Sequence, residues 1–571
     1  MLAALIASVI PLYLAWSALS LYNNVRLAKA SGLRVHVSPI STRNPLWMLF
    51  QPALVAILER LGVDTDEWLK LTKRSWNFHD RYRMHERYGK VFAHVTPSDI
   101  EVFVADAAAS DELLARKRDF LKPMHMVQII NVYGPSVAST DGADWSRHRR
   151  ITATPFNERN NRIVWGESLR QTAQLLAYFE RGVGANGSTG MLAEDSMTLT
   201  LNILTAAGLG FSCDFRGAEE KATKDEGEKA ERGAVAPGYR DCLAAVLEDF
   251  LPMGLLPKMV WSLPQWLMPK VLQEYDLHKQ TLKRFMVEMV EKTRYEGSEH
   301  ANLLSVLVQK NEEARQQKEA LSAVSTKGLS DDELYGNVFI YSFAGHETTA
   351  HAVCYAMYLL AAYPEVQDWV AEEAQSVLGT AELEHLSYDE IFPRLKRALG
   401  VMYETLRLYP PVLSIPKTTG PTPQLLTVPS ANNLTATIPA HACVFPNVVA
   451  LQSDPDYWGA DSLLWNPARW IEKHDEEEEA EESIKPPPVK GSFIPWADGP
   501  RVCPGKKFSQ VEFVAVVAAV LRAHRVEVVP QGRESCEEAR KRILEVVEDT
   551  SYGATLFMRH PEKVRVRIVR R

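Results

Sequence analysis

The residues most suited to chemistry stand in one loop near the C-terminus, Trp496-Ala497-Asp498-Gly499-Pro500-Arg501-Val502-Cys503-Pro504-Gly505. The sequence after it, KKFSQVEFVAVVAAVLRAH, predicts a helix with an apolar face. Cys503 is therefore expected at a helix N-terminus, where backbone N–H groups and nearby cations favour a thiolate. A thiolate is the haem ligand that donates electron density for O–O cleavage. Gly505 leaves room for a flat ring, and Arg501 is placed to meet a carboxylate.

Two other segments of the chain match a functional motif in residue type but lack the structural context or the spacing that the motif needs. Residues 182–187 fit GxGxxG, but a dinucleotide site needs this turn between a strand and a helix. Here it follows the helical QTAQLLAYFE, so a helix end and a loop are the better interpretation. His346 and His351 suggest a zinc-protease helix, which needs histidines four residues apart. These lie five apart, about 140° around the helix, and do not easily share one metal.

The cysteine loop closely resembles the haem-binding signature of the cytochrome P-450 family, with Trp496 where the family pattern begins with phenylalanine. Further motifs follow in the family's order, so the resemblance covers most of the chain. Glu404-Thr405-Leu406-Arg407 matches the ExxR helix, whose glutamate and arginine lie on one helical face and can pair. Asn466-Pro467-Ala468-Arg469-Trp470 matches the segment whose arginine joins them. The resemblance implies a structural triad of Glu404, Arg407 and Arg469 behind the haem.

Ala344-Gly345-His346-Glu347-Thr348-Thr349 matches the oxygen-binding helix of the same family. Gly345 weakens the helix where a distal ligand needs room; a simple kink is a compatible explanation. Thr348 supplies a hydroxyl group and Glu347 a carboxylate, the parts needed to relay protons to bound oxygen. The resemblance therefore implies that Glu347 and Thr348 are catalytic and that Ala344 and Gly345 lie at the cofactor.

Trp145-Ser146-Arg147-His148-Arg149 matches the family's WxxxR helix, in which Trp145 and Arg149 share a face and bind a haem propionate. Lys417 stands where many members have another propionate-binding arginine; lysine keeps the charge but loses the bidentate fork. The iron ligand, and the only metal ligand expected, is Cys503. The other predicted contacts of a haem b are Trp145, Arg149, Lys417, Arg501, Gly505, Ala344 and Gly345.

Apolar residues beside these motifs are candidates to face a hydrophobic substrate, although the same spacings fit an ordinary core. They include Tyr133, Phe339, Ile340, Phe343, Tyr552, Ala554 and Leu556.

Helical periodicity predicts a mainly α fold with a small β region (α+β) and one large haem domain. Helices are expected at 66–90, 164–181, 191–211, 271–295, 331–362, 364–378 and 391–409, and strands at 91–105 and 560–571. Residues 215–235 are predicted to form a loop. The predicted domains are a transmembrane signal anchor at 1–24, a linker and membrane-proximal segment at 25–60, and the haem domain at 61–571, with a flexible acidic insert at about 472–490.

Residues 2–22 contain no charged side chain, and about 20 apolar residues span a bilayer as a helix. A cleaved signal peptide would need positive charges before the apolar run, whereas Arg26, Lys29 and Arg34 follow it. The positive-inside rule then predicts a single-pass protein of the endoplasmic reticulum membrane with a cytosolic catalytic domain. A second apolar segment, 251–270, is either core or a lid that dips into the membrane.

The net charge of the chain is −8, of which residues 472–482 contribute −7 through eight acids and one base. The nearly balanced remainder gives no footprint for nucleic acid. Six cysteines without CxxC pairs do not predict a disulfide scaffold. Most of them are expected to be buried thiols.

These features predict a haem-thiolate monooxygenase that oxidises a hydrophobic small molecule with O₂. The chain shows no flavin or NADPH site, so an NADPH-dependent cytochrome P-450 reductase is the implied partner. The haem loop resembles that of fungal membrane-bound members that act in biosynthetic pathways. Two alternatives stay open: a haem-thiolate isomerase or dehydratase, and a membrane-tethered haem carrier or sensor without turnover. Glu347 and Thr348 argue against both, since neither needs an acid–alcohol pair.

Overall fold

The structure is a computed structural model, and it describes residues 2–63, 65, 68–73, 75–182, 187–219, 238–254, 256, 259–296, 302–320, 328–473 and 482–571. The chain divides into two compact units, each described by itself below. Unit 1 comprises Met1–Pro123, Arg407–Trp465 and Pro486–Cys503. Unit 2 comprises Met124–Leu406, Asn466–Lys485 and Pro504–Arg571. The predicted single domain over 61–571 stays a prediction.

Unit 1 is built on a five-stranded sheet with the order β1-β2-β3-β7-β4. The central strands β2 (Val91–Val95) and β3 (Ile100–Val104) pair antiparallel and are buried along their whole length. Their valine and phenylalanine residues favour a packed, pleated surface, and the strands predicted within 91–105 are confirmed. The other strands are β1 (Arg34–Val37), β4 (Lys417–Thr418), β7 (Cys443–Pro446) and the separate pair β5 (Gln424–Val428) and β6 (Leu434–Ile438).

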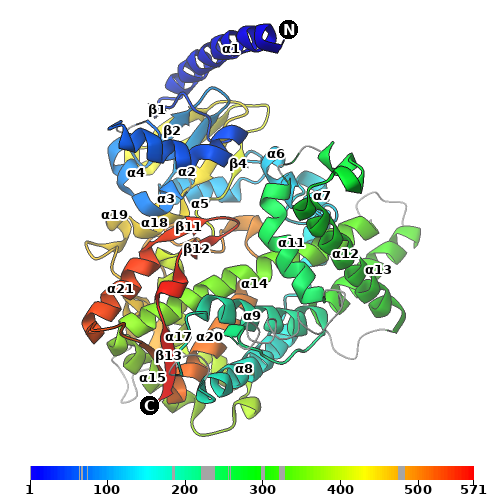
Figure 1. Cartoon of the computed structure of the whole chain (residues 1–571), viewed down its shortest axis with the longest axis vertical. Helices are drawn as coiled ribbons and strands as arrows, with labels where there is room; N and C mark the ends of the chain where they lie inside the picture. Colours follow the sequence, from blue (N-terminus) through cyan, green and yellow to red (C-terminus); the bar gives the residue numbers. More distant parts are fainter. Residues whose placement is uncertain are drawn as a thin grey trace. The chain divides into compact units, whose positions relative to one another are not determined.

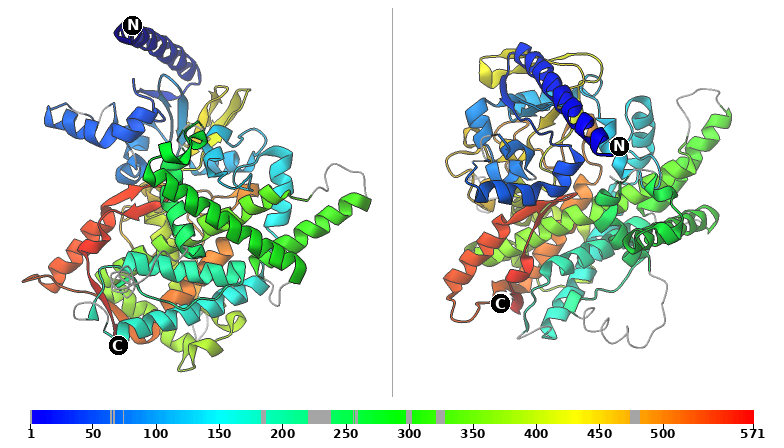
Figure 2. Two further views of the ribbon diagram at one scale, coloured as in Figure 1. Left: turned by 45° about the vertical axis from the view of Figure 1, so that its right-hand side comes forward. Right: turned by 45° about the horizontal axis from the view of Figure 1, so that its top comes forward.

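The helices of unit 1 are mostly short. They are α1 (Leu2–Ala30), α2 (Pro45–Arg60), α3 (Trp76–Asp80), α4 (Arg83–Tyr88), α5 (Ala107–Ala115), α18 (Val448–Ser453) and α19 (Pro455–Trp458). The C-terminal half of α1 is fastened near β2, since Ser20 Oγ donates to the Pro97 carbonyl at 2.6 Å and Asn24 Nδ2 to the Thr96 carbonyl at 3.0 Å. Figure 2 shows the N-terminal part of α1 extending beyond the strands.

The predicted membrane anchor falls within α1. In the part of the chain that the structure describes, no helix combines the length and the apolarity needed to cross a membrane. The side chains of residues 1–10, a large part of the predicted anchor, lie outside the described residues.

Unit 2 is mainly helical and is organised around α14 (Asp331–Ala362), which packs against α9 (Leu192–Leu204), α20 (Lys506–Ala523), α21 (Cys536–Glu548) and β10 (His524–Val528) (Figure 1). The remaining helices are α6 (Met124–Val127), α7 (Gly142–Thr152), α8 (Glu158–Glu180), α11 (Tyr239–Gly254), α12 (Lys270–Glu296), α13 (Leu303–Ala320), α15 (Pro364–Leu378), α16 (Tyr388–Ile391) and α17 (Lys396–Leu408). The remaining strands are β8 (Ile471–Lys473), β9 (Glu482–Ile484), β11 (Thr550–Tyr552), β12 (Leu556–Met558) and β13 (Val566–Arg570).

The predicted helices 331–362 and 364–378 are confirmed with the same bounds. Ser330 caps α14 in a reciprocal capping box with Glu333, which satisfies two exposed backbone N–H groups. Pro364 begins α15, where its missing N–H has no cost. The prediction for 271–295 is confirmed as α12, and the C-terminal strand is confirmed as β13, which pairs antiparallel with β10.

The single helix predicted at 66–90 is wrong. Ser75 and Arg81 have positive φ angles of 62° and 60°, which no continuous helix accepts, and they separate α3 and α4 from the chain around them. The buried carboxylate of Asp80 explains the second break, because it accepts from Met84 N at 2.6 Å and pairs with Lys70. The helix predicted at 391–409 begins only at Lys396, after a 3₁₀ turn at Phe392–Arg394.

Two predicted irregular segments fall partly on residues that the structure does not describe. Of the predicted loop 215–235, residues 220–235 lie outside the described residues, as do residues 474–481 of the acidic insert. The edges of that insert are ordered, since β8 pairs with β9 and Glu482 forms an ion pair with Arg397 at 2.8 Å. Of the GxGxxG sequence, Gly182 ends α8 with φ +73°, as expected for a helix end, and residues 183–186 are not described.

Candidate active site

The cysteine loop is a tight, internally bonded turn of unit 1 that ends at an exposed thiol. Cys503 N donates to the Trp496 carbonyl at 3.0 Å, and Val502 N donates to the Gly499 carbonyl at 3.1 Å. Gly499 has φ +68°, and a Cβ there would lie 2.7 Å from the Leu114 carbonyl oxygen, so only glycine fits. These contacts fix the loop and leave Cys503 exposed three residues before α20 begins.

The other cysteines differ from Cys503 in their surroundings. Cys242, Cys354 and Cys443 are buried, and burial raises the pKa of each thiol, which disfavours the thiolate. Cys213 is half-buried. Cys536 is exposed at the first turn of α21 but lacks the glycine-rich loop and its arginine.

Two predicted haem contacts in unit 1 are cationic groups withdrawn from solvent. Lys417 is buried on β4, opposite Val444 of β7. The Nε and Nη1 atoms of Arg501 are buried in the 3₁₀ turn Gly499–Arg501. Burying cations is costly unless they meet an anion or hydrogen-bond acceptors. A thiol on an open loop with withdrawn cations on the same unit fits a haem, which needs an iron ligand and partners for its propionates.

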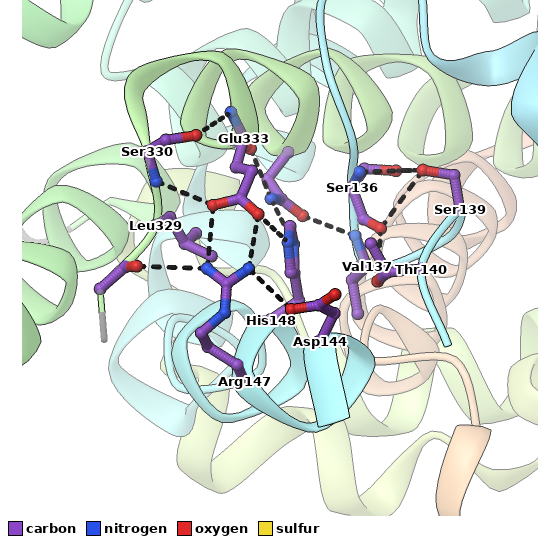
Figure 3. Close-up of polar contacts among 12 residues, drawn as sticks. Ser136, Val137, Ser139, Thr140, Asp144, Arg147, His148, Leu329, Ser330 and Glu333 are labelled. Carbon is purple, nitrogen blue, oxygen red and sulfur yellow. Dashed lines mark hydrogen bonds and ion pairs between the residues drawn. The ribbon is translucent and has the colours of Figure 1, made fainter. Parts of the chain in front are cut away.

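In unit 2, α7 carries the other two predicted propionate residues on one face. Trp145 is buried and Arg149 half-buried. The helix is held to the start of α14 by Arg147, whose guanidinium donates to both oxygens of Glu333 at 2.5 and 2.9 Å (Figure 3). His148 Nε2 lies 3.2 Å from the same carboxylate, and its Nδ1 lies 3.0 Å from Asn337 Nδ2. Arg147 therefore links α7 to α14 through an ion pair and is not simply a solvated cation.

The charge of Glu333 is stabilised by its donors. Burial alone would raise its pKa, but hydrogen bonds from Arg147, the Ser330 backbone and His148 lower it to about 2. Burial lowers the pKa of His148, while Glu333 opposes that effect. Glu333 is therefore a permanent anion that holds α7 in place.

The predicted oxygen-binding motif is the one open stretch in the buried length of α14 between Leu334 and Ala350, as far as the structure describes it. Ala344 is exposed, and Gly345, Glu347 and Thr348 are half-buried. Thr348 Oγ1 donates to the Ala344 carbonyl at 2.9 Å, which holds its hydroxyl against the helix. A pocket of about 1380 Å³ opens beside His346 and Glu347, with α9, α11 and α12 in its wall. The pocket therefore leaves open space beside the Glu347 carboxyl group.

Gly345 has a packing role that the sequence did not reveal. A Cβ at this position would lie 3.1 and 3.2 Å from the methyl carbons of Leu204 on α9. The missing side chain therefore lets α9 and α14 approach closely. Within the described residues α14 continues unbroken through Gly345.

The carboxylate of Glu347 is partly withdrawn from water and has one identified hydrogen-bond donor. Thr555 Oγ1 donates to its Oε1 at 2.9 Å. Burial raises the pKa of Glu347, and the bond from Thr555 opposes that rise. An acid with a raised pKa can hold a proton closer to neutral pH, as a proton carrier requires.

Of the predicted triad residues, Glu404 and Arg407 are fully buried and Arg469 is half-buried, and Glu404 contacts Arg469. Glu404 Oε1 accepts from Asn466 N at 2.9 Å and lies 3.4 Å from Arg469 Nε, and its Oε2 accepts from Trp470 Nε1 at 2.9 Å. Arg407, which belongs to unit 1, donates to the carbonyl oxygens of Gln452, Ser462 and Leu464 in the same unit. The contacts of Glu404 and Arg407 hold segments of the fold together, as expected for a structural role.

Three of the substrate-facing candidates are packed into unit 2. Tyr133 and Phe339 meet edge to face at 5.1 Å, and both are buried, as is Ile340. Tyr133 also donates to the Lys279 carbonyl at 3.1 Å. The core alternative holds for these three and for Leu556, which is fully buried, whereas Phe343, Tyr552 and Ala554 are half-buried.

Sequence reasoning missed several polar groups near the motif. Thr555 contacts Glu347, 208 residues earlier in the chain, and also contacts His351, and no local signal in the sequence announces either contact. Glu512 is fully buried in α20, and burial raises its pKa well above the usual value; neither of its carboxyl oxygens has a hydrogen-bond partner among the described residues. His346 and His351 belong to no cluster of metal-binding side chains among the described residues.

Family comparison agrees with this geometry. The family model for cytochrome P-450 matches residues 67–549. The chain therefore belongs to the cytochrome P-450 family, and the predicted class of haem-dependent monooxygenase is confirmed.

Several named fungal proteins are similar along most of their length. A cytochrome P-450 monooxygenase of Arthrobotrys oligospora is 27% identical over 96% of this chain and 95% of its own. One of Penicillium roqueforti is 29% identical over 94% and 93%. The cytochrome P-450 monooxygenase of the phomenoic acid biosynthesis cluster of Leptosphaeria maculans is 26% identical over 82% and 81%.

Glu333→Gln is expected to destabilise the protein in a pH-dependent way. Because the folded-state pKa of Glu333 is about 2, below its ordinary 4.5, its contribution is present above pH 4.5 and is lost as the pH falls toward 2. At pH 7 the substitution should lower the free energy of unfolding by about 2 kcal/mol, the scale of hydrogen bonds to a charged group. Urea unfolding followed by tryptophan fluorescence measures this.

Asp389→Asn is the matched control, since it removes an acid from the exposed ion pair with Arg162 and should change little. An equal loss for Glu333→Gln at pH 7 and at pH 3 would contradict the assigned charge.

Proposed function

We propose that this enzyme holds a haem b through Cys503 and oxidises a hydrophobic small molecule with O₂ and electrons from an NADPH-dependent cytochrome P-450 reductase. The observation that carries the proposal is the opening in the buried length of α14 at Ala344–Thr348, where Ala344 is exposed and where Glu347 and Thr348 supply a half-buried carboxyl group and a half-buried hydroxyl group. An isomerase or a haem carrier needs neither group.

The residues divide the work by their chemistry. Cys503 supplies the thiolate, and Lys417, Arg501, Arg149 and Trp145 hold the propionates. When bound, the haem supplies the iron at which O₂ is activated. Glu347 takes up a proton from the side of the pocket, and Thr348 presents a hydroxyl that can pass it on. Ala344 adds only a methyl group, so the flat ring is not crowded there.

The substrate class is inferred from the side chains near the oxygen-binding motif and from the relatives. Half-buried apolar side chains at Phe343 and Ala554, with Tyr552, favour an apolar organic molecule. The relative from Leptosphaeria maculans is named for the phomenoic acid biosynthesis cluster, which supports a role in a biosynthetic pathway.

Membrane attachment is part of the proposal. The uncharged run 2–22 would anchor the protein in the endoplasmic reticulum membrane, with the catalytic domain in the cytosol. A stripe of exposed apolar side chains on and just after α2 supports a membrane-proximal segment there; it comprises Leu46, Phe50, Leu54, Ile57 and Leu61. In the second apolar segment, Trp266 is 80% exposed, whereas Trp261 packs against Tyr275.

Cys503→Ala tests the haem assignment. It should abolish the thiolate-type carbon monoxide spectrum of the reduced protein, because no other described cysteine has this loop and its arginine. Cys536→Ala is the control, since it removes an exposed thiol from another helix N-terminus. Retention of the spectrum in Cys503→Ala would refute the central assignment.

Electron delivery is predicted to depend on cations beside the cysteine loop. Lys506 and Arg150 are exposed, whereas Arg147 is engaged by Glu333 and Lys507 lies 4.1 Å over the Phe392 ring. Reversing both exposed charges (K506E/R150E) should slow reductase-supported turnover about three- to tenfold at low ionic strength and less at high salt. Peroxide-driven turnover should not change.

Lys541→Glu on the exposed face of α21 is the control for the charge change itself. If peroxide-driven turnover falls as much as reductase-supported turnover, the substitutions have damaged the haem pocket and the docking proposal loses its support.

Deleting residues 1–30 should weaken membrane binding without eliminating it, because the α2 stripe and Trp266 remain and tryptophan is favoured at the interface. Co-sedimentation with phosphatidylcholine vesicles measures the membrane binding that remains in the truncated protein. Trp266→Ser in the truncated protein should lower it further, and Tyr295→Ser, at another exposed aromatic position, should not. A truncated protein found wholly in the supernatant would refute the second membrane contact.

A further inference from the structure

A hairpin at the C-terminal end of unit 2 reaches the predicted proton-delivery residue. The connection between β11 and β12 carries Thr555, whose hydroxyl donates to Glu347 Oε1 at 2.9 Å and lies 3.0 Å from Nδ1 of His351. Glu347 and His351 stand four residues apart on α14, on one face of the helix. A single buried hydroxyl therefore sits between an acid and an imidazole.

The direction of these hydrogen bonds follows from the protons available. Burial lowers the pKa of His351 to about 4, with a further contribution from His346, so the ring is neutral at pH 7. A threonine hydroxyl has one proton to donate. If it donates to the Glu347 carboxylate, His351 must donate its Nδ1–H to the hydroxyl oxygen. His351 thus orients the hydroxyl toward the acid.

We infer that Thr555 is a positioning residue for Glu347: its hydroxyl, oriented by His351, holds the carboxyl group in place and favours its ionised form between proton transfers. This inference rests on the proposed role of Glu347 in proton delivery. It also links that role to the hairpin that carries Tyr552 and Ala554, the half-buried candidates for substrate contact.

The hairpin does not need the Thr555 hydroxyl for its own stability. The hairpin already has the β11–β12 ladder from Thr550–Met558 to Tyr552–Leu556, and Leu556 is buried. Thr550 is a useful comparison, because its hydroxyl is buried in the same hairpin and makes no hydrogen bond within the described residues. Of the two threonine hydroxyls in the hairpin, that of Thr555 contacts the acid and that of Thr550 does not.

Other charged and titratable groups lie close to Glu347 or line the same pocket, and their protonation also contributes to a pH titration of Glu347. Burial raises the pKa of Tyr552 to about 12, to which the charge of Glu347 contributes, so the phenol stays neutral. The remaining groups are His346 on α14 and, in the pocket wall, Glu194, Asp214, Arg216, Asp241, Glu288 and Lys292.

The decisive measurement is an infrared pH titration of the Glu347 carboxyl in the full-length holoenzyme. The difference between wild type and Glu347→Gln isolates its protonated C=O band, and the difference between Thr555→Val and Thr555→Val/Glu347→Gln isolates the same band in the variant. In Thr555→Val the titration midpoint should move to higher pH, because burial is no longer opposed by the hydroxyl bond. Thr555→Ser and Thr550→Val should keep the wild-type midpoint.

Peroxide released per NADPH, with reductase and dodecanoic acid as the apolar probe, provides the second readout. Thr555→Val should raise this ratio about fivefold, the factor that corresponds to one hydrogen bond of ordinary net strength, while Thr555→Ser and Thr550→Val should not. An unchanged midpoint in Thr555→Val would overturn the inference even if Glu347→Gln raises peroxide release. If Glu347→Gln itself leaves peroxide release unchanged, the proposed role of Glu347 fails first.

Discussion

The buried carboxylate of Glu404 is the constraint on which the arrangement of α17 and the segment Asn466–Trp470 in unit 2 depends. A fully buried charge is tolerated only when hydrogen bonds and an opposite charge replace its water. Asn466 N, Arg469 and Trp470 supply these partners, so α17 and the segment Asn466–Trp470 must stay together. The Trp470 carbonyl then accepts from Lys485 N, which joins the two sides of the acidic insert. Removing one partner would leave the charge unsatisfied, which is costlier than never having buried it.

The cysteine loop differs from the Glu404 site, because its functional group, the Cys503 thiol, is exposed rather than buried. Backbone hydrogen bonds inside the loop replace side-chain packing: Cys503 N and Val502 N are both satisfied by carbonyl groups of the same turn. Gly499 allows the turn to pass close to Leu114 of α5. The loop is thus rigid without being covered, and a thiol can be exposed there without loss of order. Preorganisation of this kind avoids the cost of fixing the ligand when the metal binds.

Local signals in the sequence predicted the parts of the fold that local interactions determine. The acidic residues at 331–333 and the proline at 364 suit the starts of α14 and α15, and β-branched and aromatic residues predicted β2 and β3. The helix predicted at 66–90 was wrong because a tertiary contact, the buried Asp80 with Lys70, overrides helical periodicity. The role of Gly345 was also non-local, since Leu204 of α9 determines it. Thr555 could not be found from the sequence, because a lone threonine in a hairpin carries no sign of the acid that it meets.

Two glutamates on α14 show how the number of donors decides the use of a buried acid. Both lose hydration by burial, which raises the pKa of each. Glu333 receives hydrogen bonds from an arginine, a backbone N–H and a histidine, and its pKa falls to about 2, so it serves as a fixed anion between helices. Glu347 receives one bond from a neutral hydroxyl, and its pKa stays raised. An arginine beside Glu347 would give it the fixed charge of Glu333 and remove it from proton exchange. A single hydroxyl donor orients the group and still leaves its proton available for transfer, which is the property that the proposed proton delivery by Glu347 requires.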